Sequence, residues 1–124
     1  MTKKSELGQY GEDLACRFLI KNGYKIVERN FRKPWGEIDI IAKSPDKTLV
    51  FVEVKTMQDR GELELKPEDQ LSQSKLTKVA KTANMYAGSN EKLVDKKRGW
   101  QIDLIAITID SEGAPSITHY QNIA

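Results

Sequence analysis

The chain has 124 residues, with 39% hydrophobic and 31% charged residues, which fits one domain over residues 1–124. No apolar run approaches the roughly 20 residues of a membrane span, and the N-terminal segment lacks the apolar stretch of a signal peptide. The single cysteine allows no internal disulfide. We therefore expect a cytoplasmic protein. The net charge of +2 permits nucleic-acid binding but does not by itself argue for it.

The first half of the chain is predicted to form one helix and three strands. Apolar residues recur at three- and four-residue spacing over residues 5–22, the pattern of an amphipathic helix. Three segments rich in β-forming residues follow, over residues 24–31, 36–43 and 48–56. The turn-forming sequence SPDK separates the last two strands, which we therefore expect to form a hairpin.

The second half is predicted to form a helix and two further strands. A polar segment, residues 57–66, reads as a mobile loop, and Pro67 suits the first position of a helix that ends near residues 88–90. Apolar strands are expected over residues 100–109 and 117–120. The order α, β, β, β, α, β, β predicts an α/β fold with at least one hairpin and one crossover helix.

Three charged residues interrupt the otherwise apolar second and third strands: Asp39, Glu53 and Lys55. Alternation places Glu53 and Lys55 on one face, about 7 Å apart along the strand. Asp39 shares that face and lies opposite Glu53 if paired residue numbers sum to 92, which needs an odd-length loop or a bulge. An even loop would place Asp39 on the other face, and the sequence leaves both registers open.

A carboxylate pair of this kind is typical of a magnesium site. Two converging carboxylates repel each other, and Mg²⁺ or Mn²⁺ bound by Asp39 and Glu53 would remove that repulsion. Such a cation acidifies water into a nucleophile, and the Lys55 ammonium could stabilise charge on a phosphate. Glu12 could reach the same cluster, since Gly8 and Gly11 let its helix approach the sheet closely. The alternatives are a half-exposed Glu–Lys pair with Asp39 capping a turn, and a solvated Glu12.

Several basic residues suit contacts with nucleic acid. Arg29, Arg32 and Lys33 lie beside aromatic residues just before the second strand, a combination that fits phosphate contacts and base stacking. Lys75 borders the second helix. The alternative for the first three is a solvated turn. We assign no role to His119, the one histidine.

Four motifs, GQYGEDLA, NFRKPWGEIDIIA, VFVEVKT and IDLIAI, occur in this order from Gly8 to about Ile107. In these motifs the chain resembles the bacterial YraN family, which is similar to the PD-(D/E)XK nuclease superfamily and nearest to archaeal Holliday-junction resolvases. The resemblance implies a restriction-endonuclease-like mixed β-sheet flanked by helices, with the core order αβββαβ. By position, Glu12 matches the first-helix acid, Asp39 the motif aspartate, and Glu53 and Lys55 the Glu-X-Lys pair. Thr56 departs from the basic residue that many relatives have after that pair. Lys75 resembles the basic residue of the family's second helix, which implies a contact with phosphate.

These observations favour a Mg²⁺-dependent endonuclease that acts on DNA, in particular on branched or structured DNA. The alternatives are a non-catalytic nucleic-acid-binding or partner-docking domain that retains the fold, and a hydrolase of a small phosphate ester. Cutting both strands of a duplex needs two active sites, which suggests a homodimer. The strand over residues 100–109 would offer a pairing edge if exposed, although a central position, with Trp100 covering one end of the core, is favoured.

Overall fold

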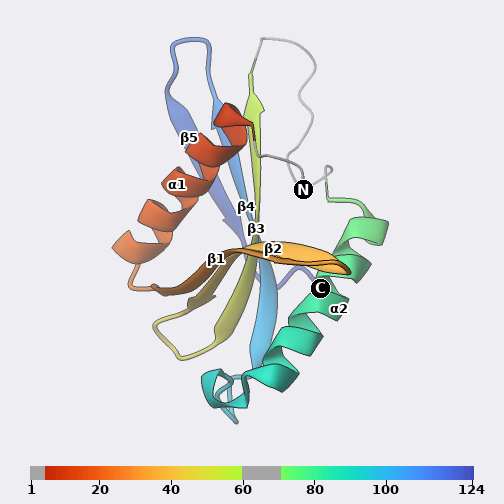
Figure 1. The fold of residues 1–124 in the computed structure, drawn as a ribbon. Coiled ribbons are helices and arrows are strands. Elements are labelled where there is room, and N and C mark those ends of the chain that lie inside the picture. Colours follow the sequence, from red (N-terminus) through yellow and green to blue (C-terminus); the bar gives the residue numbers. More distant parts are fainter. Residues whose placement is uncertain (1–4, 60–70) are drawn as a thin grey trace.

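The computed structural model describes residues 5–59 and 71–124 and shows a mixed five-stranded sheet with a helix on each face (Figure 1). The helices and strands follow the predicted α/β order: α1 (Glu6–Lys21), β1 (Lys25–Lys33), β2 (Gly36–Lys43), β3 (Leu49–Gln58), α2 (Gln73–Ser89), β4 (Trp100–Ile109) and β5 (Pro115–Tyr120). A short 3-10 helix, η2 (Glu91–Leu93), follows α2. Neither helix in the described part of the chain is long and apolar enough to cross a membrane.

The strands lie in sequence order across the sheet, β1-β2-β3-β4-β5. β3 and β4 are parallel and connected through α2, whereas the other neighbours are antiparallel. β4 therefore lies inside the sheet, as favoured from the sequence: β3 pairs with its whole length, and β5 pairs with its second part, from Leu104 to Ile109. The Trp100 ring packs edge-on against Phe51, with 5.5 Å between centroids, and covers one end of the core.

Each helix covers one face of the sheet because alternate strand residues point to opposite sides. Ala15, Cys16 and Leu19 of α1 pack against one face, together with Val50 and Val52 of β3. On the opposite face, the core beneath α2 is formed by fully or nearly fully buried side chains: Val79, Ala83, Tyr86, Leu49, Phe51 and Ile102. β3 is thus buried on both sides, which explains its continuous apolar sequence.

Four element boundaries differ from the prediction by two residues or more. β1 continues to Lys33 because Arg32 and Lys33 pair with Glu37 and Gly36, so the expected loop over residues 32–35 shrinks to a tight turn. β3 continues to Gln58 because it pairs with the full length of β4. α2 begins at Gln73, because the Ser72 hydroxyl accepts the Lys75 backbone N–H and caps the helix. The predicted start at Pro67 lies outside the described residues. The predicted loop likewise lies mostly outside them. β5 begins at Pro115 and not at residue 117, because Pro115 and Ser116 pair with the end of β4.

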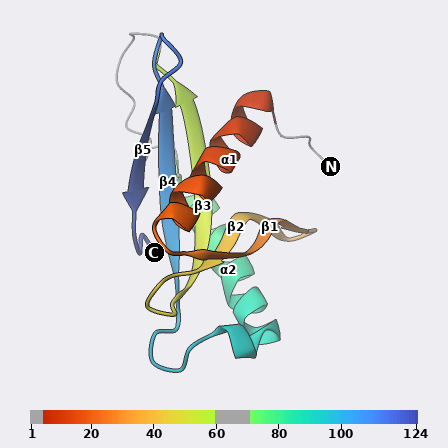
Figure 2. The same ribbon diagram turned by 90° about the vertical axis from the view of Figure 1, so that its left-hand side faces the viewer.

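The β1–β2 hairpin runs across the direction of the other three strands (Figures 1 and 2). The ladder between β2 and β3 is consequently short and ends at Ile40 and Val52. Its residue pairs, from Lys43–Leu49 to Ile40–Val52, sum to 92. Of the two registers that the sequence left open, the structure therefore has the one that sets Asp39 opposite Glu53, where β2 leaves β3.

Close approach of α1 to β3 depends on Gly11. A Cβ atom built on Gly11 would overlap the Thr56 side chain, which agrees with the expectation that small residues bring this helix close to the sheet. We expect Gly11→Ala to lower the free energy of unfolding by about 1–3 kcal/mol, the usual cost of overpacking. Gly88→Ala in α2 is the matched control, because nothing lies within 4 Å of its Cβ, and it should stabilise by about 1 kcal/mol. Urea unfolding of the three proteins measures both; equal stability of Gly11→Ala and wild type would contradict the prediction.

Candidate functional site

The candidate site lies where β2 leaves β3, and its centre is the pair Asp39 and Glu53. Because the backbone ladder has ended, the Asp39 side chain takes its place: Oδ2 accepts the Val54 N–H at 2.9 Å. Glu53 is 4% exposed, and its Oε1 atom receives no hydrogen bond from the described residues. A buried carboxylate oxygen without a donor is costly, and a divalent cation that prefers oxygen ligands would satisfy it. The pair therefore fits a Mg²⁺ ion.

The electrostatics of Glu53 favour its protonated form when no cation is bound. Burial raises the pKa of Glu53 well above its usual value, and the neighbouring Asp39 charge raises this pKa further. Lys75 of α2 acts in the opposite direction, since its Nζ lies 3.9 Å from Glu53 Oε2. Lys75 is half-exposed, so it offsets only part of the effect of burial.

This raised pKa makes the stability of the metal-free protein depend on pH. The folded state binds the Glu53 proton more tightly than the unfolded chain, so the stabilisation is complete below the usual pKa of 4.5 and is lost as pH rises through the folded value. We expect the free energy of unfolding in EDTA to fall over that window in the wild type and to stay flatter in Glu53→Gln. Glu91→Gln, an exposed carboxylate, should keep the wild-type slope. A wild-type slope in Glu53→Gln would contradict the assignment.

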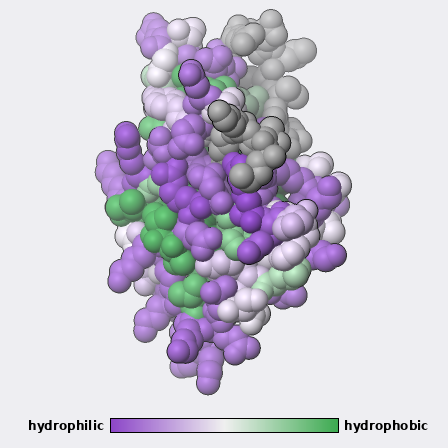
Figure 3. Space-filling view, viewed as in Figure 1, coloured by the Kyte–Doolittle hydropathy of each residue, from purple (hydrophilic) through white to green (hydrophobic). Residues whose placement is uncertain are grey.

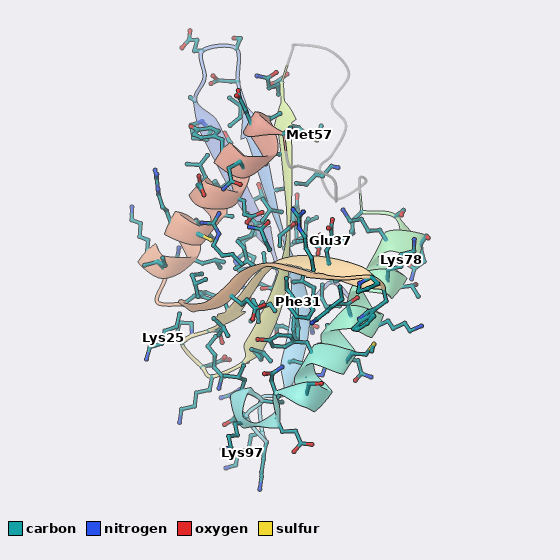
Figure 4. The ribbon with its side chains drawn as sticks, viewed as in Figure 1. Lys25, Phe31, Glu37, Met57, Lys78 and Lys97 are labelled. Atoms are coloured by element: carbon teal, nitrogen blue, oxygen red, sulfur yellow. The ribbon has the colours of Figure 1, made fainter. Side chains whose placement is uncertain are left out.

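A cavity of about 200 Å³ adjoins the carboxylate pair on the side of α1. Glu12, Asp39 and Lys55 all line it, so these three predicted site residues face one space. A second cavity, of about 410 Å³, lies between the start of β2 and the N-terminal half of α2 and is lined by Glu37, Lys75 and Lys78 (Figure 4). Since Lys75 also reaches Glu53, the two cavities flank the candidate site.

Glu12 is fully buried, but its carboxylate faces β1. Arg29 Nη2 lies 3.3 Å from Glu12 Oε1 and 2.7 Å from Asp13 Oδ1. The hydrogen bond from Arg29 lowers the pKa of Asp13. Among residues 5–59 and 71–124, no group of three or more His, Cys, Asp or Glu could hold a metal ion. Arg29 pairs with one oxygen of Glu12, and Glu12 also lines the cavity that Asp39 and Lys55 share, so its part in the site stays a prediction.

Most of the predicted phosphate-binding residues have carboxylates as neighbours within the protein. Arg29 pairs with α1, Lys75 with Glu53, and Arg32 Nε lies 3.9 Å from Glu37 Oε2 across the β1–β2 hairpin. Lys33 differs, since its Nζ lies 5.6 Å from the centroid of the Phe31 ring. Contacts of these four side chains with nucleic acid stay a prediction.

Sequence reasoning missed the partner of His119. Its Nε2 lies 2.7 Å from Asp103 Oδ2, and Asp103 Oδ1 also accepts the Asn122 N–H and a Gln101 side-chain N–H. Asp103 is fully buried, so this pair joins β4 to β5 inside the protein. The contact between His119 and Asp103 follows from the antiparallel pairing of β4 with β5, but predicting it requires the register of these two strands, which the sequence does not give. Asp103 is thus a paired structural residue.

Comparison with known proteins places the chain among small bacterial proteins. Residues 11–107 match the family described as "Uncharacterised protein family UPF0102". A UPF0102 protein of Campylobacter concisus is 43% identical over 105 residues, which cover 85% of this chain and 86% of that protein. A UPF0102 protein of Pelobacter propionicus is 40% identical over 116 residues, 93% of this chain and 79% of that protein. One from Corynebacterium efficiens is 32% identical over 123 residues, 98% and 94% of the two chains.

Proposed function

The chain belongs to the UPF0102 family, and we propose that it is a Mg²⁺- or Mn²⁺-dependent endonuclease that hydrolyses phosphodiester bonds in DNA. The observation that supports this proposal best is the buried Glu53 carboxylate, which lies beside Asp39 with one oxygen lacking a hydrogen-bond donor among the described residues. Two carboxylates this close repel each other when both are ionised, and a bound cation would remove that repulsion. The motif resemblance to PD-(D/E)XK nucleases is consistent with this role.

Each residue of the site has a distinct task in the proposed reaction. Asp39 and Glu53 hold the cation, and the Val54 N–H fixes the orientation of Asp39. When bound, the cation supplies Lewis-acid stabilisation of the phosphodiester and acidification of an attacking water. Lys55, which lines the same cavity as Asp39, stabilises negative charge that develops on the phosphate. Lys75 balances the charge of Glu53 from the opposite side.

The shape of the site favours a polymer over a small ester. One cavity lies beside α1 and the other beside α2, and each is lined by a lysine, Lys55 in the first and Lys75 in the second, which suits phosphates on both sides of the cleaved bond. Arg32 and Lys33 of the hairpin would contact neighbouring phosphates. The choice of DNA, and of branched or structured DNA in particular, is based on the motif resemblance, as is a homodimer that would supply two sites.

A non-catalytic nucleic-acid-binding or partner-docking domain is the second candidate. The salt bridge between Arg29 and Glu12 favours it, because a carboxylate that is already paired inside the protein has less need of a cation. Such a domain would bind its partner without turnover. The two candidates differ in one measurable property, metal-dependent strand cleavage.

Cleavage of a panel of DNAs tests the proposal. The panel contains single-stranded, nicked, flapped and four-way substrates, each incubated with Mg²⁺, Mn²⁺ or EDTA. Cleavage that needs the cation and prefers one substrate supports the endonuclease and identifies its substrate class. Binding without cleavage under every condition would favour the second candidate, and sedimentation of the same protein would show whether it is a dimer.

A further inference from the structure

Seven basic residues gather at the end of the molecule where β3 and β4 begin. This basic end consists of residue 25, residues 43–47 and residues 91–98, and its cations are Lys25, Lys43, Lys47, Lys92, Lys96, Lys97 and Arg98. Lys25 and Lys43 are direct cross-strand partners, and the Leu49 N–H donates to the Gly99 carbonyl at 3.1 Å, which joins the two turns. Figure 4 shows Lys25 and Lys97 extending outward at this end, and Figure 3 shows its surface as hydrophilic.

The positive charge of the basic end is only partly offset by carboxylates of the protein. Beyond the backbone hydrogen bonds that lower the pKa of Asp95, the charges of Lys47 and Lys43 lower it further. The pKa of Asp46 is likewise lowered first by hydrogen bonds and then by the charge of Arg98. Across the residues that the structure describes, none of its seven cations forms an ion pair within 4 Å. The main partners of its acidic residues are backbone N–H groups and hydroxyls of the turns: Asp46 accepts from Ser44 and Thr48, and Asp95 accepts the N–H groups of Lys97 and Arg98. Near the candidate site, by contrast, Arg29, Arg32 and Lys75 all face carboxylates.

Charge is therefore distributed unevenly over the molecule. Seven cations and three carboxylates give the basic end a formal charge of +4, whereas the whole chain carries +2, so the rest carries −2. Setting Lys25 directly opposite Lys43 also works against folding, since like charges in cross-strand positions repel. A concentrated and unpaired positive surface of this kind suits a polyanion with regularly spaced charges.

We propose that the basic end binds the phosphate backbone of duplex DNA, as a second contact for the substrate away from the cleaved bond. Leu49, at the basic end, and Glu53 are four residues apart on β3, which corresponds to about 13 Å. That span equals about four steps of a DNA strand at 3.4 Å each, so one duplex arm can reach both places. The choice of DNA as the polyanion rests on the proposed function. The inference that this surface binds a polyanion rests only on its charges.

The salt dependence of DNA binding tests this inference. The triple variant Lys47→Gln, Lys96→Gln, Lys97→Gln removes three exposed cations without altering a hydrogen bond of their side chains. The matched control Arg17→Gln, Lys21→Gln, Lys81→Gln removes three exposed cations elsewhere and has the same net charge. With a duplex probe in EDTA, the slope of log affinity against log salt should fall by about 2.7 in the test variant, at about 0.9 per contact. In the control variant the slope should change by less than about 0.9, the value for one phosphate contact.

The outcomes separate this inference from the proposed function. An unchanged slope in the test variant, equal slopes in both variants, or no duplex binding by the wild type at low salt would overturn the second contact. In the first two cases the proposed function would still hold if the wild type cleaves DNA in the presence of Mg²⁺. Conversely, if the wild type cleaves no DNA but the two variants show the expected slopes, the basic end is supported as a DNA-binding surface and the endonuclease proposal is contradicted. Unchanged melting temperatures of both variants would show that they fold.

Discussion

Asp39→Asn is expected to lower the rate of Mg²⁺-dependent DNA cleavage by at least about 10³-fold, which corresponds to about 4 kcal/mol of transition-state stabilisation. The substitution keeps the size of the side chain and an oxygen that can accept the Val54 N–H, so the end of the β2–β3 ladder should survive. It removes the negative charge that holds the cation together with Glu53. Rates under single-turnover conditions with saturating DNA measure the effect on the chemical step.

Calorimetric titration with Mn²⁺ links this loss of rate to the metal. Both Asp39→Asn and Glu53→Gln should lose Mn²⁺ binding, and both should keep the wild-type affinity for duplex DNA in EDTA, since the basic residues are unchanged. Asp110→Asn is the matched control, because this carboxylate caps an exposed turn before β5 and should leave cleavage unaltered. Wild-type rates in Asp39→Asn would remove this residue from the catalytic machinery.

His119→Leu should lower the free energy of unfolding by about 3–5 kcal/mol, the usual cost of leaving a buried carboxylate without its partner. Asp103 is fully buried, and His119 Nε2 lies 2.7 Å from its Oδ2. At this chain length the loss corresponds to a fall of more than about 10 °C in the melting temperature. Thermal unfolding followed by circular dichroism measures it.

A double variant distinguishes the loss of the partner from the loss of packing. His119 also contacts the ring of Phe18, with 5.9 Å between centroids, so Leu replaces part of that apolar contact. Asp103→Asn removes the charge but keeps an oxygen that can accept the Asn122 N–H. The double variant His119→Leu, Asp103→Asn should therefore be more stable than His119→Leu alone. If His119→Leu lowers the free energy of unfolding by less than about 1 kcal/mol, water can replace His119 as the hydrogen-bond donor to Asp103, and the prediction is contradicted.

The sequence by itself determined the elements whose patterns are local. β2 and β4 have the predicted bounds, since each is an apolar run between turn-forming residues, and α1 lies within one residue of its predicted ends at both sides. The positions of Asp39, Glu53 and Lys55 within strands followed from the same patterns. The first residue of α2 did not, because the hydrogen bond from the Lys75 N–H to the Ser72 hydroxyl, which caps the helix, was not recognised in the sequence.

The tertiary structure decided which side chains meet. The β2–β3 register depended on the turn, where Ser44 N–H donates to the Thr48 carbonyl and closes an odd-length loop that sets Asp39 opposite Glu53. Likewise, the pairing of Arg29 with Glu12 joins residues 17 positions apart. Local sequence patterns report the periodicity of a helix or strand but not the path of the chain between elements. Contacts between distant segments, such as the Asp103–His119 pair and the basic end, therefore became visible only in the folded protein.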